Sequence, residues 1–298
     1  MHATYQSCHS YIRRPNVPAA VLTPFYQKVL GLPVIRPVGE MVTFWAGEDL
    51  CFEIKCDSTD RGEHNDPDRA QTLPIMRSHD LAGTERRLAR HGVTPAHRSS
   101  SRAGDRIWVE GPDGHLFGFE ERDADSELAA DREALRRWRA GETRLPGVGE
   151  LPPDLHYMSR ILLHVHDVTA VSEFYDSGFG LDRVTQEGES ILHSLGDTVL
   201  LEIAPGGKQR PVPADRTEVA NIVMTRVRDL DAFIADMATA GAPQSGDTIE
   251  FFTGSRAAYF ADPEGNLLGV QQRTLWGSYP EDIEAERRWH ARKPAPSA

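Results

Sequence analysis

The chain has 298 residues, 39% of them hydrophobic and 26% charged, which is enough for two ordinary domains with sizeable cores. A formal net charge of −12 disfavours a nucleic-acid partner, because binding phosphates requires clustered Lys and Arg side chains. No apolar run approaches the roughly 18 residues of a membrane span and the three cysteines form no disulfide or metal pattern, so we expect a cytoplasmic protein that binds small molecules.

The first 56 residues predict one strand, then a helix, then three more strands. Residues 5–14 are typical of a strand, and residues 18–30 are typical of a helix that ends at Gly31. Short β-prone runs follow around 34–35, at 41–45 and at 50–55, with turn residues between them. This order is a βαβββ module.

The same order begins again after the polar stretch 57–71. A predicted strand at 72–77 leads into a helix at 80–90, where Asp80 can cap free backbone amides. The next strand is poorly defined at 95–101. Strands at 107–110 and 116–120, a helix at 126–138 and a linker at 141–154 with Pro-Gly and Pro-Pro pairs follow.

The second half of the chain repeats the first. The segment Glu110–Gly118 resembles Ala261–Gly269, and both contain a Pro-acid-Gly turn that leads into apolar residues. Predicted strands and helices recur at 160–165, 168–177, 190–195, 199–203, 221–227, 230–240, 257–260 and 267–271. The chain therefore holds four βαβββ modules.

Three motifs recur in the same order in both halves. They are Phe-Tyr in the helix (Phe25-Tyr26, Phe174-Tyr175), Gly-Leu after it (Gly31-Leu32, Gly180-Leu181), and the closing turns Pro112-Asp113-Gly114 and Pro263-Glu264-Gly265. In these residues the chain resembles the vicinal oxygen chelate superfamily, which includes glyoxalase I, methylmalonyl-CoA epimerase, extradiol ring-cleaving dioxygenases and metal-free bleomycin-resistance proteins. The resemblance covers residues 4–122 and 156–273.

The resemblance implies an α+β fold of two tandem domains. Each domain is expected to pair two βαβββ modules into a half-open barrel and to carry a C-terminal helix. We expect the first domain at 1–140, a linker at 141–155 and the second domain at 156–298. Because the fused pair mimics the dimers of single-domain relatives, the chain could be a monomer or a homodimer.

The resemblance also implies where a metal would bind, because ligands in this superfamily come from the first and fourth strand of each module. The first-strand position lies seven residues before the Asp or Asn that starts the helix. It holds His9, Leu73, Arg160 and Ile222, and the fourth-strand position holds Glu53, Gly118, Glu202 and Gly269.

These residues argue against ordinary extradiol chemistry. Enzymes of that kind take their iron ligands from the second domain, where Arg160, Ile222 and Gly269 cannot hold iron. His9 and Glu53 make half a site for a divalent metal in the first domain, which His115 or Glu120 could complete if a strand register differs. No cofactor is certain from the sequence.

Strand alternation predicts which side chains face the hollow of each barrel, because residues two apart share a face. The predicted sets are His9, Tyr11, Arg13, Cys51, Glu53, Arg77 and Glu120 in the first domain, and Arg160, His164, Glu202, Met224, Arg226 and Gln271 in the second. We take His9, Glu53, Arg160 and His164 as candidate catalytic residues. Candidate ligand-binding residues are Tyr11, Arg13, Arg77, Glu120, Glu202, Arg226 and Gln271.

A structural interpretation stands beside each assignment. Arg160–Glu202 and His9–Glu53 could be ion pairs between neighbouring strands, because buried charges are costly unless they are paired. Arg13, Arg77, His164 and Arg226 lie three residues before the helix in all four modules, which favours scaffolding. The aromatic residues Tyr11, Trp45, Phe52, Trp108 and Tyr259 could line a ligand site or belong to the core. Trp138 and Trp289 are expected to pack the helices that carry them.

Two functions from different classes fit this sequence. The first is an enzyme, an isomerase, lyase or dioxygenase-like protein with a degenerate metal site, that acts on an oxygenated metabolite by proton transfer or metal-assisted enolisation. The second is a non-catalytic binder similar to bleomycin-resistance proteins. A third, weaker alternative is that one domain is catalytic and the other completes the scaffold.

Overall fold

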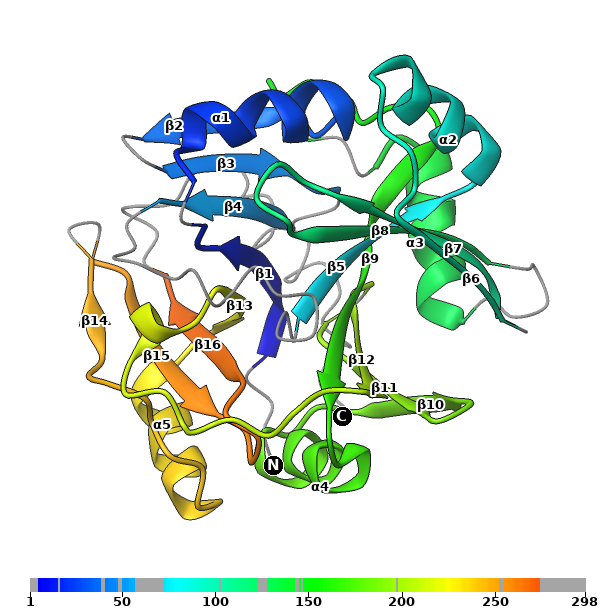
Figure 1. Cartoon of the computed structure of the whole chain (residues 1–298). Helices are drawn as coiled ribbons and strands as arrows, with labels where there is room; N and C mark the ends of the chain where they lie inside the picture. The colour runs from blue at the N-terminus through cyan, green and yellow to red at the C-terminus, as the bar shows by residue number, and fades with distance from the viewer. Residues whose placement is uncertain are drawn as a thin grey trace.

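The computed structural model describes residues 5–15, 17–38, 41–47, 50–56, 72–101, 103–122, 128–142, 145, 147–196, 198–251 and 254–273 (Figure 1). The predicted linker at 57–71, Asn16, and the C-terminal helix with Trp289 lie outside these ranges. Within them, no helix has the length and apolar character needed to cross a membrane.

All four predicted modules are present. Module one comprises β1 (Tyr5–Arg13), α1 (Ala19–Pro24), β2 (Val34–Val38), β3 (Met41–Trp45) and β4 (Cys51–Lys55). Module two comprises β5 (Thr72–Ser78), α2 (Leu81–Arg90), β6 (His97–Ser101), β7 (Gly104–Glu110) and β8 (Leu116–Arg122), and α3 (Ala129–Arg139) follows it. Module three comprises β9 (Leu155–Val165), α4 (Val168–Glu173), β10 (Arg183–Glu187), β11 (Ser190–Ser194) and β12 (Leu200–Pro205). Module four comprises β13 (Asn221–Val227), α5 (Leu230–Thr239), β14 (Ile249–Glu250), β15 (Arg256–Ala261) and β16 (Leu267–Gln272).

The strands form two eight-stranded sheets (Figure 1). Sheet A has the order β14-β15-β16-β13-β1-β4-β3-β2, and sheet B has the order β10-β11-β12-β9-β5-β8-β7-β6. The antiparallel pair β1–β13 joins module one to module four, and the pair β5–β9 joins module two to module three. The α+β class and the paired modules are thus confirmed, but each sheet combines modules from both halves of the chain, whereas the sequence-based division pairs consecutive modules.

The main hydrophobic core lies where the helices meet one face of both sheets. The Tyr26 ring lies 4.7 Å from the Phe52 ring of β4 and 6.3 Å from the Phe117 ring of β8, measured between centroids. Tyr26 follows α1 in a π-helical turn, Phe25–Val29, and Phe174–Gly178 forms the equivalent turn after α4. The helical segment of module one therefore packs against both sheets at once.

The repeated Pro-acid-Gly turns hold the ends of the central strands. At the end of β1, Arg13 Nε donates a hydrogen bond to Asp113 Oδ2 at 3.1 Å. At the end of β9, the backbone amides of His166 and Asp167 donate to the Glu264 carboxylate at 2.7 and 2.6 Å. The turn of module two therefore fixes module one, and the turn of module four fixes module three.

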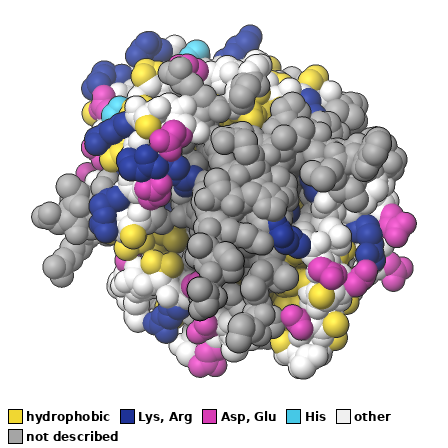
Figure 2. Space-filling view, turned by 180° about the vertical axis from the view of Figure 1, so that it is seen from behind, with side chains coloured by type: hydrophobic (Ala, Val, Ile, Leu, Met, Phe, Trp, Pro, Cys, Tyr) yellow, Lys and Arg dark blue, Asp and Glu magenta, His cyan; other side chains and the backbone are white. Residues whose placement is uncertain are grey.

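Helix α3 packs against β9, and the described part of the rear face carries charged side chains of both signs (Figure 2). Trp138 of α3 stacks on His156 of β9 with ring centroids 4.2 Å apart, which confirms its predicted packing role. Acidic and basic side chains alternate over the described part of the rear face, without a broad basic patch there (Figure 2).

Candidate functional site

Each sheet has a second face, which we call its cup face, that does not belong to the main core. A separate apolar cluster marks each of them: Leu73, Ile75, Leu162, Trp108 and Ala204 on sheet B, and Ile12, Ile222, Met224, Tyr259, Ala257, Ala261 and Leu267 on sheet A. Because side chains alternate along a strand, the residues two positions away from these lie on the same face.

The cup face of sheet B carries a cluster of charged side chains that we call the cup cluster. Its members are Arg106 on β7, Glu120 and Arg122 on β8, Arg160 on β9, Glu187 on β10 and Glu202 on β12. Three of these residues come from module two and three from module three, so the cluster forms only because these two modules share a sheet.

Arg160 is the centre of the cup cluster and is fully buried. Its Nε lies 3.0 Å from Glu120 Oε1, and its Nη1 lies 3.2 Å from both Glu202 Oε2 and Glu187 Oε2. Its Nη2 is buried and has no hydrogen-bond partner among the described residues. A buried donor without a partner is costly, so this nitrogen marks a place where an oxygen atom of a ligand could bind.

Arg106 connects two strands that are far apart in the sheet order. Its Nη2 lies 2.9 Å from Glu202 Oε2 and 3.1 Å from Glu120 Oε2, although β8, β5 and β9 lie between β7 and β12. Its guanidinium also lies 5.7 Å from the centre of the Trp108 ring. Sheet B is therefore curled, and the ion pairs span its hollow.

The cluster shifts the pKa of each acid according to its surroundings. Burial raises the pKa of Glu120, but Arg160 and Arg106 outweigh this effect and lower it to about 2. Burial is likewise outweighed at Glu202, where Arg106 and Arg160 lower the pKa. Burial raises the pKa of Glu187, whose side chain is 23% exposed. His164, two residues after Leu162 on the same face, has a pKa lowered by burial, so its imidazole is neutral at pH 7.

The ligand positions implied by the resemblance do not fit a metal in sheet B. Leu73, Gly118 and Arg160 offer no metal-binding atom, and Glu202 is held by two arginines. A Cβ atom at Gly118 would lie 2.8 Å from Trp108 and 2.9 Å from Ile75, so these side chains fill the space where a ligand residue would start. Across the described ranges, no group of three His, Cys, Asp or Glu side chains is arranged to hold an ion.

Sheet A keeps only part of the predicted site. Glu53 is buried and lies 3.1 Å from Lys55 Nζ. Burial raises its pKa, but Lys55, Arg273 and Arg36 together lower it. On the same face, Gly269 has no room for a side chain because a Cβ atom would lie 2.1 Å from Met224 Sδ. The side chain of His9 lies outside the described part, so the metal role of His9 and Glu53 stays a prediction.

The strand register corrects the alignment of His9 with Arg160. In sheet A, Ser10 of β1 pairs with Cys51 of β4, which precedes Glu53 by two residues. In sheet B, Arg160 of β9 pairs with Leu200 of β12, which precedes Glu202 by two residues. Ser10 is therefore the counterpart of Arg160. The pairing of β1 with β13 is irregular between Cys8 and Ser10, and this irregularity displaces His9 by one position.

Tyr11 and Arg13 do not share a face with Glu53 as predicted. Tyr11 pairs with Phe52, stacks on its ring at 5.7 Å and donates its hydroxyl to Thr72 O at 2.6 Å within the main core. Arg13 binds Asp113. His115 lies beside Tyr11, with its Nε2 3.3 Å from the Tyr11 hydroxyl, so it belongs to this core and not to the cup face.

The other predicted residues divide between the two sheets. On sheet B, Arg77 of β5 lies opposite Glu120 of β8 in the strand register, and its Nη2 donates a hydrogen bond to the backbone oxygen of Arg122 at 3.4 Å. Arg226 pairs with Gln271 on sheet A, and Gln271 accepts a hydrogen bond from Arg273 Nε at 3.1 Å. The predicted ion pair Arg160–Glu202 is present. The predicted pair His9–Glu53 lies outside what the structure describes.

Sequence reasoning missed Arg106, Arg122 and Glu187. Arg106 stands two residues before Trp108, and Arg122 two residues after Glu120, so strand alternation could have found both. No strand was predicted at 183–187, so Glu187 had no signal.

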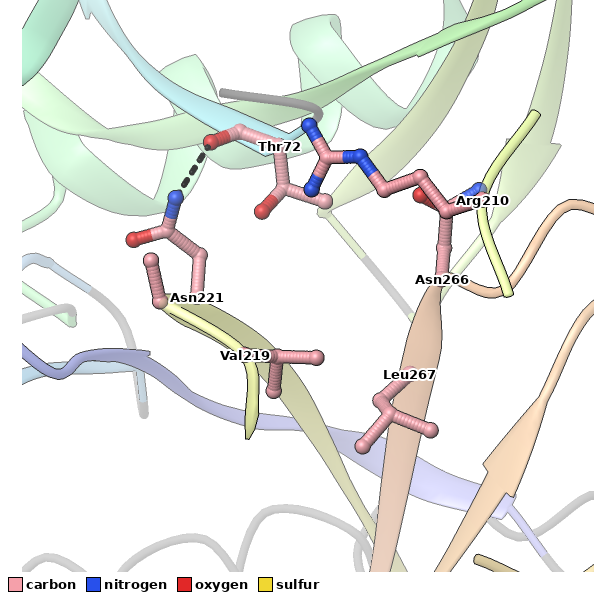
Figure 3. Close-up of a pocket in the computed structure, with 7 residues that line it drawn as sticks. Thr72, Arg210, Val219, Asn221, Asn266 and Leu267 are labelled. Atoms are coloured by element: carbon pink, nitrogen blue, oxygen red, sulfur yellow. Dashed lines mark hydrogen bonds between the residues drawn. The ribbon is translucent and has the colours of Figure 1, made fainter. Parts of the chain in front are cut away.

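A small cavity lies between β13, the start of β5 and the turn before β16. It has a volume of about 20 Å³ and is lined by Thr72, Arg210, Val219, Ala220, Asn221, Asn266 and Leu267 (Figure 3). Asn221 Nδ2 donates to Thr72 O at 3.4 Å across it. Its volume suits about one water molecule, so it is too small to hold a metabolite.

Comparisons with known proteins agree with this fold. Residues 156–270 match the model of the Glyoxalase/Bleomycin resistance protein/Dioxygenase superfamily. Comparison with curated proteins finds no match. Glyoxalase I from Zea mays superposes with a TM-score of 0.62 at 12% identity, covering 96% of this chain and 95% of that one. A Bacillus subtilis protein described as a "putative dioxygenase" superposes with a TM-score of 0.61 at 16% identity, covering 95% and 90%.

The fold and the four modules define an α+β protein in which paired βαβββ units form two sheets. Residues 156–270 match the glyoxalase/bleomycin resistance/dioxygenase superfamily, and the internal repeat extends the same module order to the first half of the chain. Structural likeness at these identities concerns the fold alone.

Proposed function

We propose that the protein is an enzyme that moves a proton on a small oxygenated metabolite bound at the cup face of sheet B. The observation that carries this proposal is the fully buried Arg160, whose Nη2 has no partner among the described residues and which lies on the superfamily's ligand-bearing strand. A guanidinium can stabilise the negative oxygen that develops when a proton leaves the carbon beside a carbonyl group.

The neighbouring side chains suit the other roles in such a step. His164 is half-buried on the same face, and its lowered pKa keeps the imidazole able to accept a proton at pH 7. Glu202, held by Arg106 and Arg160, raises the pKa of His164 and so favours the imidazolium that would form. The proton would pass from the carbon to His164 and return to the same or the neighbouring carbon.

Proton exchange tests this proposal directly. We expect the wild-type protein in D2O to remove the proton signal beside the carbonyl group of at least one 2-oxo or 2-hydroxy carbonyl compound, followed by proton NMR. His164→Asn should slow this exchange by about 100-fold, in line with the usual contribution of a general base. The matched control is Arg256→Met on β15 of sheet A, which removes the ion pair with Asp231 of α5 at the surface. This variant should exchange like the wild type.

Non-catalytic binding is the second candidate. It is favoured by the filled positions at Gly118 and Gly269, which leave the described cup faces without a set of metal ligands. Saturable binding of a compound that is recovered without deuterium would support this candidate and reject the enzyme. Deuterium incorporation that His164→Asn leaves unchanged would reject the role of His164.

A further inference from the structure

Glu187 is the most exposed acid of the cup cluster, and the geometry points to a specific role for it. We propose that its carboxylate is an internal substitute for a carboxylate of the substrate, and that the substrate is a 2-oxo or 2-hydroxy acid that displaces it. This inference rests on the proposed function for the location of the site, but its test measures binding and not turnover.

Two buried arginines grip Glu187 in the manner of a carboxylate ligand. Arg122 Nη2 lies 2.6 Å from Oε1 and Arg122 Nη1 lies 3.2 Å from Oε2, which is a bidentate fork. Arg160 Nη1 lies 3.2 Å from Oε2. The side chains of Arg122 and Arg160 are 2% and 0% exposed. Arg122 Nε also lies 3.6 Å from Asp131 Oδ2, and Arg160 keeps its contacts with Glu120 and Glu202, so a ligand with a carboxylate of its own would replace the negative charge that leaves with Glu187.

The attachment of Glu187 is weak compared with that of the other acids. Its strand β10 lies at the edge of sheet B and pairs only with β11, and most of its residues are exposed or half-buried. The hairpin turns at Gly188, where φ is 60° and a side chain would meet nothing within 4 Å. Glu120 and Glu202 lie on inner strands, with side chains only 4% and 10% exposed. Glu187 can therefore leave without breaking the inner part of the sheet.

The donors that remain define the ligand. When Glu187 leaves, the two Arg122 nitrogens that held it, Nη1 and Nη2, can donate to one carboxylate in bidentate fashion. Arg160 Nη1 keeps its contact with Glu202 at 3.2 Å, but its donor that faced Glu187 becomes available beside Nη2, which has no partner among the described residues. This edge of the guanidinium can donate to an oxygen on the carbon next to the carboxylate. A 2-oxo or 2-hydroxy acid carries both features, whereas the corresponding amide lacks the negative charge.

Among its described residues, sheet A has no equivalent of this arrangement. The hairpin register places Val38 where sheet B has Glu187, because Val38 pairs with Met41 as Glu187 pairs with Ser190. The position of Arg106, which lies opposite Glu120 in the strand register of sheet B, is occupied in sheet A by Ala257, which lies opposite Gln271. Carboxylate binding of this kind is therefore expected on sheet B and not on sheet A.

The matched pair Glu187→Gln and Glu250→Gln tests the proposal. Glu250 lies on β14, the edge strand of sheet A, and also pairs with an arginine, Arg256, at 3.7 Å. Titration calorimetry with 2-oxobutyrate should give a Kd about tenfold lower for Glu187→Gln than for the wild type, because the ligand no longer has to displace the Glu187 carboxylate from the arginines. Glu250→Gln should bind like the wild type, and 2-oxobutyramide should not gain affinity in either variant.

A second measurement on the wild type covers the case in which Glu187→Gln does not fold. Saturating 2-oxobutyrate should increase hydrogen–deuterium exchange in residues 183–187, because displacement of Glu187 loosens β10. Equal affinities of the two variants, or no increase in exchange at β10, would overturn the proposal. Retained binding in His164→Asn without proton exchange would support it while separating it from the proposed reaction.

Discussion

Glu120 is the acid on which the cup cluster depends most, because it is almost wholly buried between Arg106, Arg160 and Ser159. Replacing it by Gln would leave the fully buried Arg160 and the half-buried Arg106 short of a negative charge. We expect Glu120→Gln to lower the free energy of unfolding by about 3 kcal/mol at pH 7, the size found when one partner of a buried ion pair is removed. Urea unfolding measures this difference, and Glu133→Gln, half-exposed on α3, is the control that should change it by less than about 0.5 kcal/mol.

The same substitution predicts a pH dependence. The folded pKa of Glu120, about 2, lies below its ordinary value of 4.5, so the folded protein keeps the carboxylate charged where the unfolded chain binds a proton. The stabilisation is complete above pH 4.5 and is lost as the pH falls towards 2. The difference between wild type and Glu120→Gln should therefore shrink over this range, and a difference independent of pH would contradict the assignment.

Single residues were predicted well where strand alternation alone decides their place. The pair Arg160–Glu202 follows from two neighbouring parallel strands, and the structure contains it. Tyr11 was placed on the wrong face because its position was counted from His9, across the irregular register of β1. One extra residue in a strand moves all later side chains to the other face, and the sequence carries no mark of it.

Among the elements, the helices of modules two, three and four share one start signal. Asp80, Asp167 and Asp229 each accept a hydrogen bond from the backbone amide three residues later, at 2.7, 3.0 and 3.0 Å. The first helix differs: α1 begins after Pro18, which provides no side-chain cap. The alignment that treated Asn16 as the start of this helix is therefore two residues early.

The cap of α5 allows a clean test. Asp229→Ala should lower the free energy of unfolding by about 1 kcal/mol, because it leaves the amide of Ala232 without its acceptor. Asp229→Asn retains an oxygen acceptor and should cost only a few tenths of this amount, measured by urea unfolding. An equal loss in both variants would mean that the charge at the start of the helix matters more than the hydrogen bond.

Edge strands were the elements least visible in the sequence. β6 at His97–Ser101 was poorly defined and β10 at Arg183–Glu187 was not predicted, and both lie at an edge of sheet B. An edge strand with solvent on one face needs few apolar residues, so its alternation is weak. The π-helical turns after α1 and α4 also had no signal, although the Phe-Tyr motif marks where both begin.

At the scale of the whole molecule, the duplication predicted the modules but not their partners. A repeat identifies equivalent segments, whereas the choice between strands of the same half and strands of the other half depends on which edges meet. The sequence therefore placed Glu120 and Arg160 in different barrels, and the structure brings them to 3.0 Å. The cup cluster is a consequence of pairing between the halves.

This pairing makes a prediction about the isolated halves. If consecutive modules formed self-contained domains, residues 1–140 would fold as a monomer. In the structure, β1 and β5 each depend on a partner strand from the second half, β13 and β9. We expect residues 1–140 alone to aggregate or to form a dimer in which these open edges pair with a second copy, as seen by size-exclusion chromatography with light scattering.

Co-expression supplies the missing partner strands. Residues 1–140 and 141–298 produced together should co-purify as one complex near the 33.1 kDa of the intact chain and regain cooperative unfolding, because both sheets can then form. A monomeric first half with cooperative unfolding would instead support the division into tandem domains. In that case the ion pairs of Arg160 with Glu120, and of Arg106 with Glu202, would be contacts between finished domains and could be removed without unfolding either half.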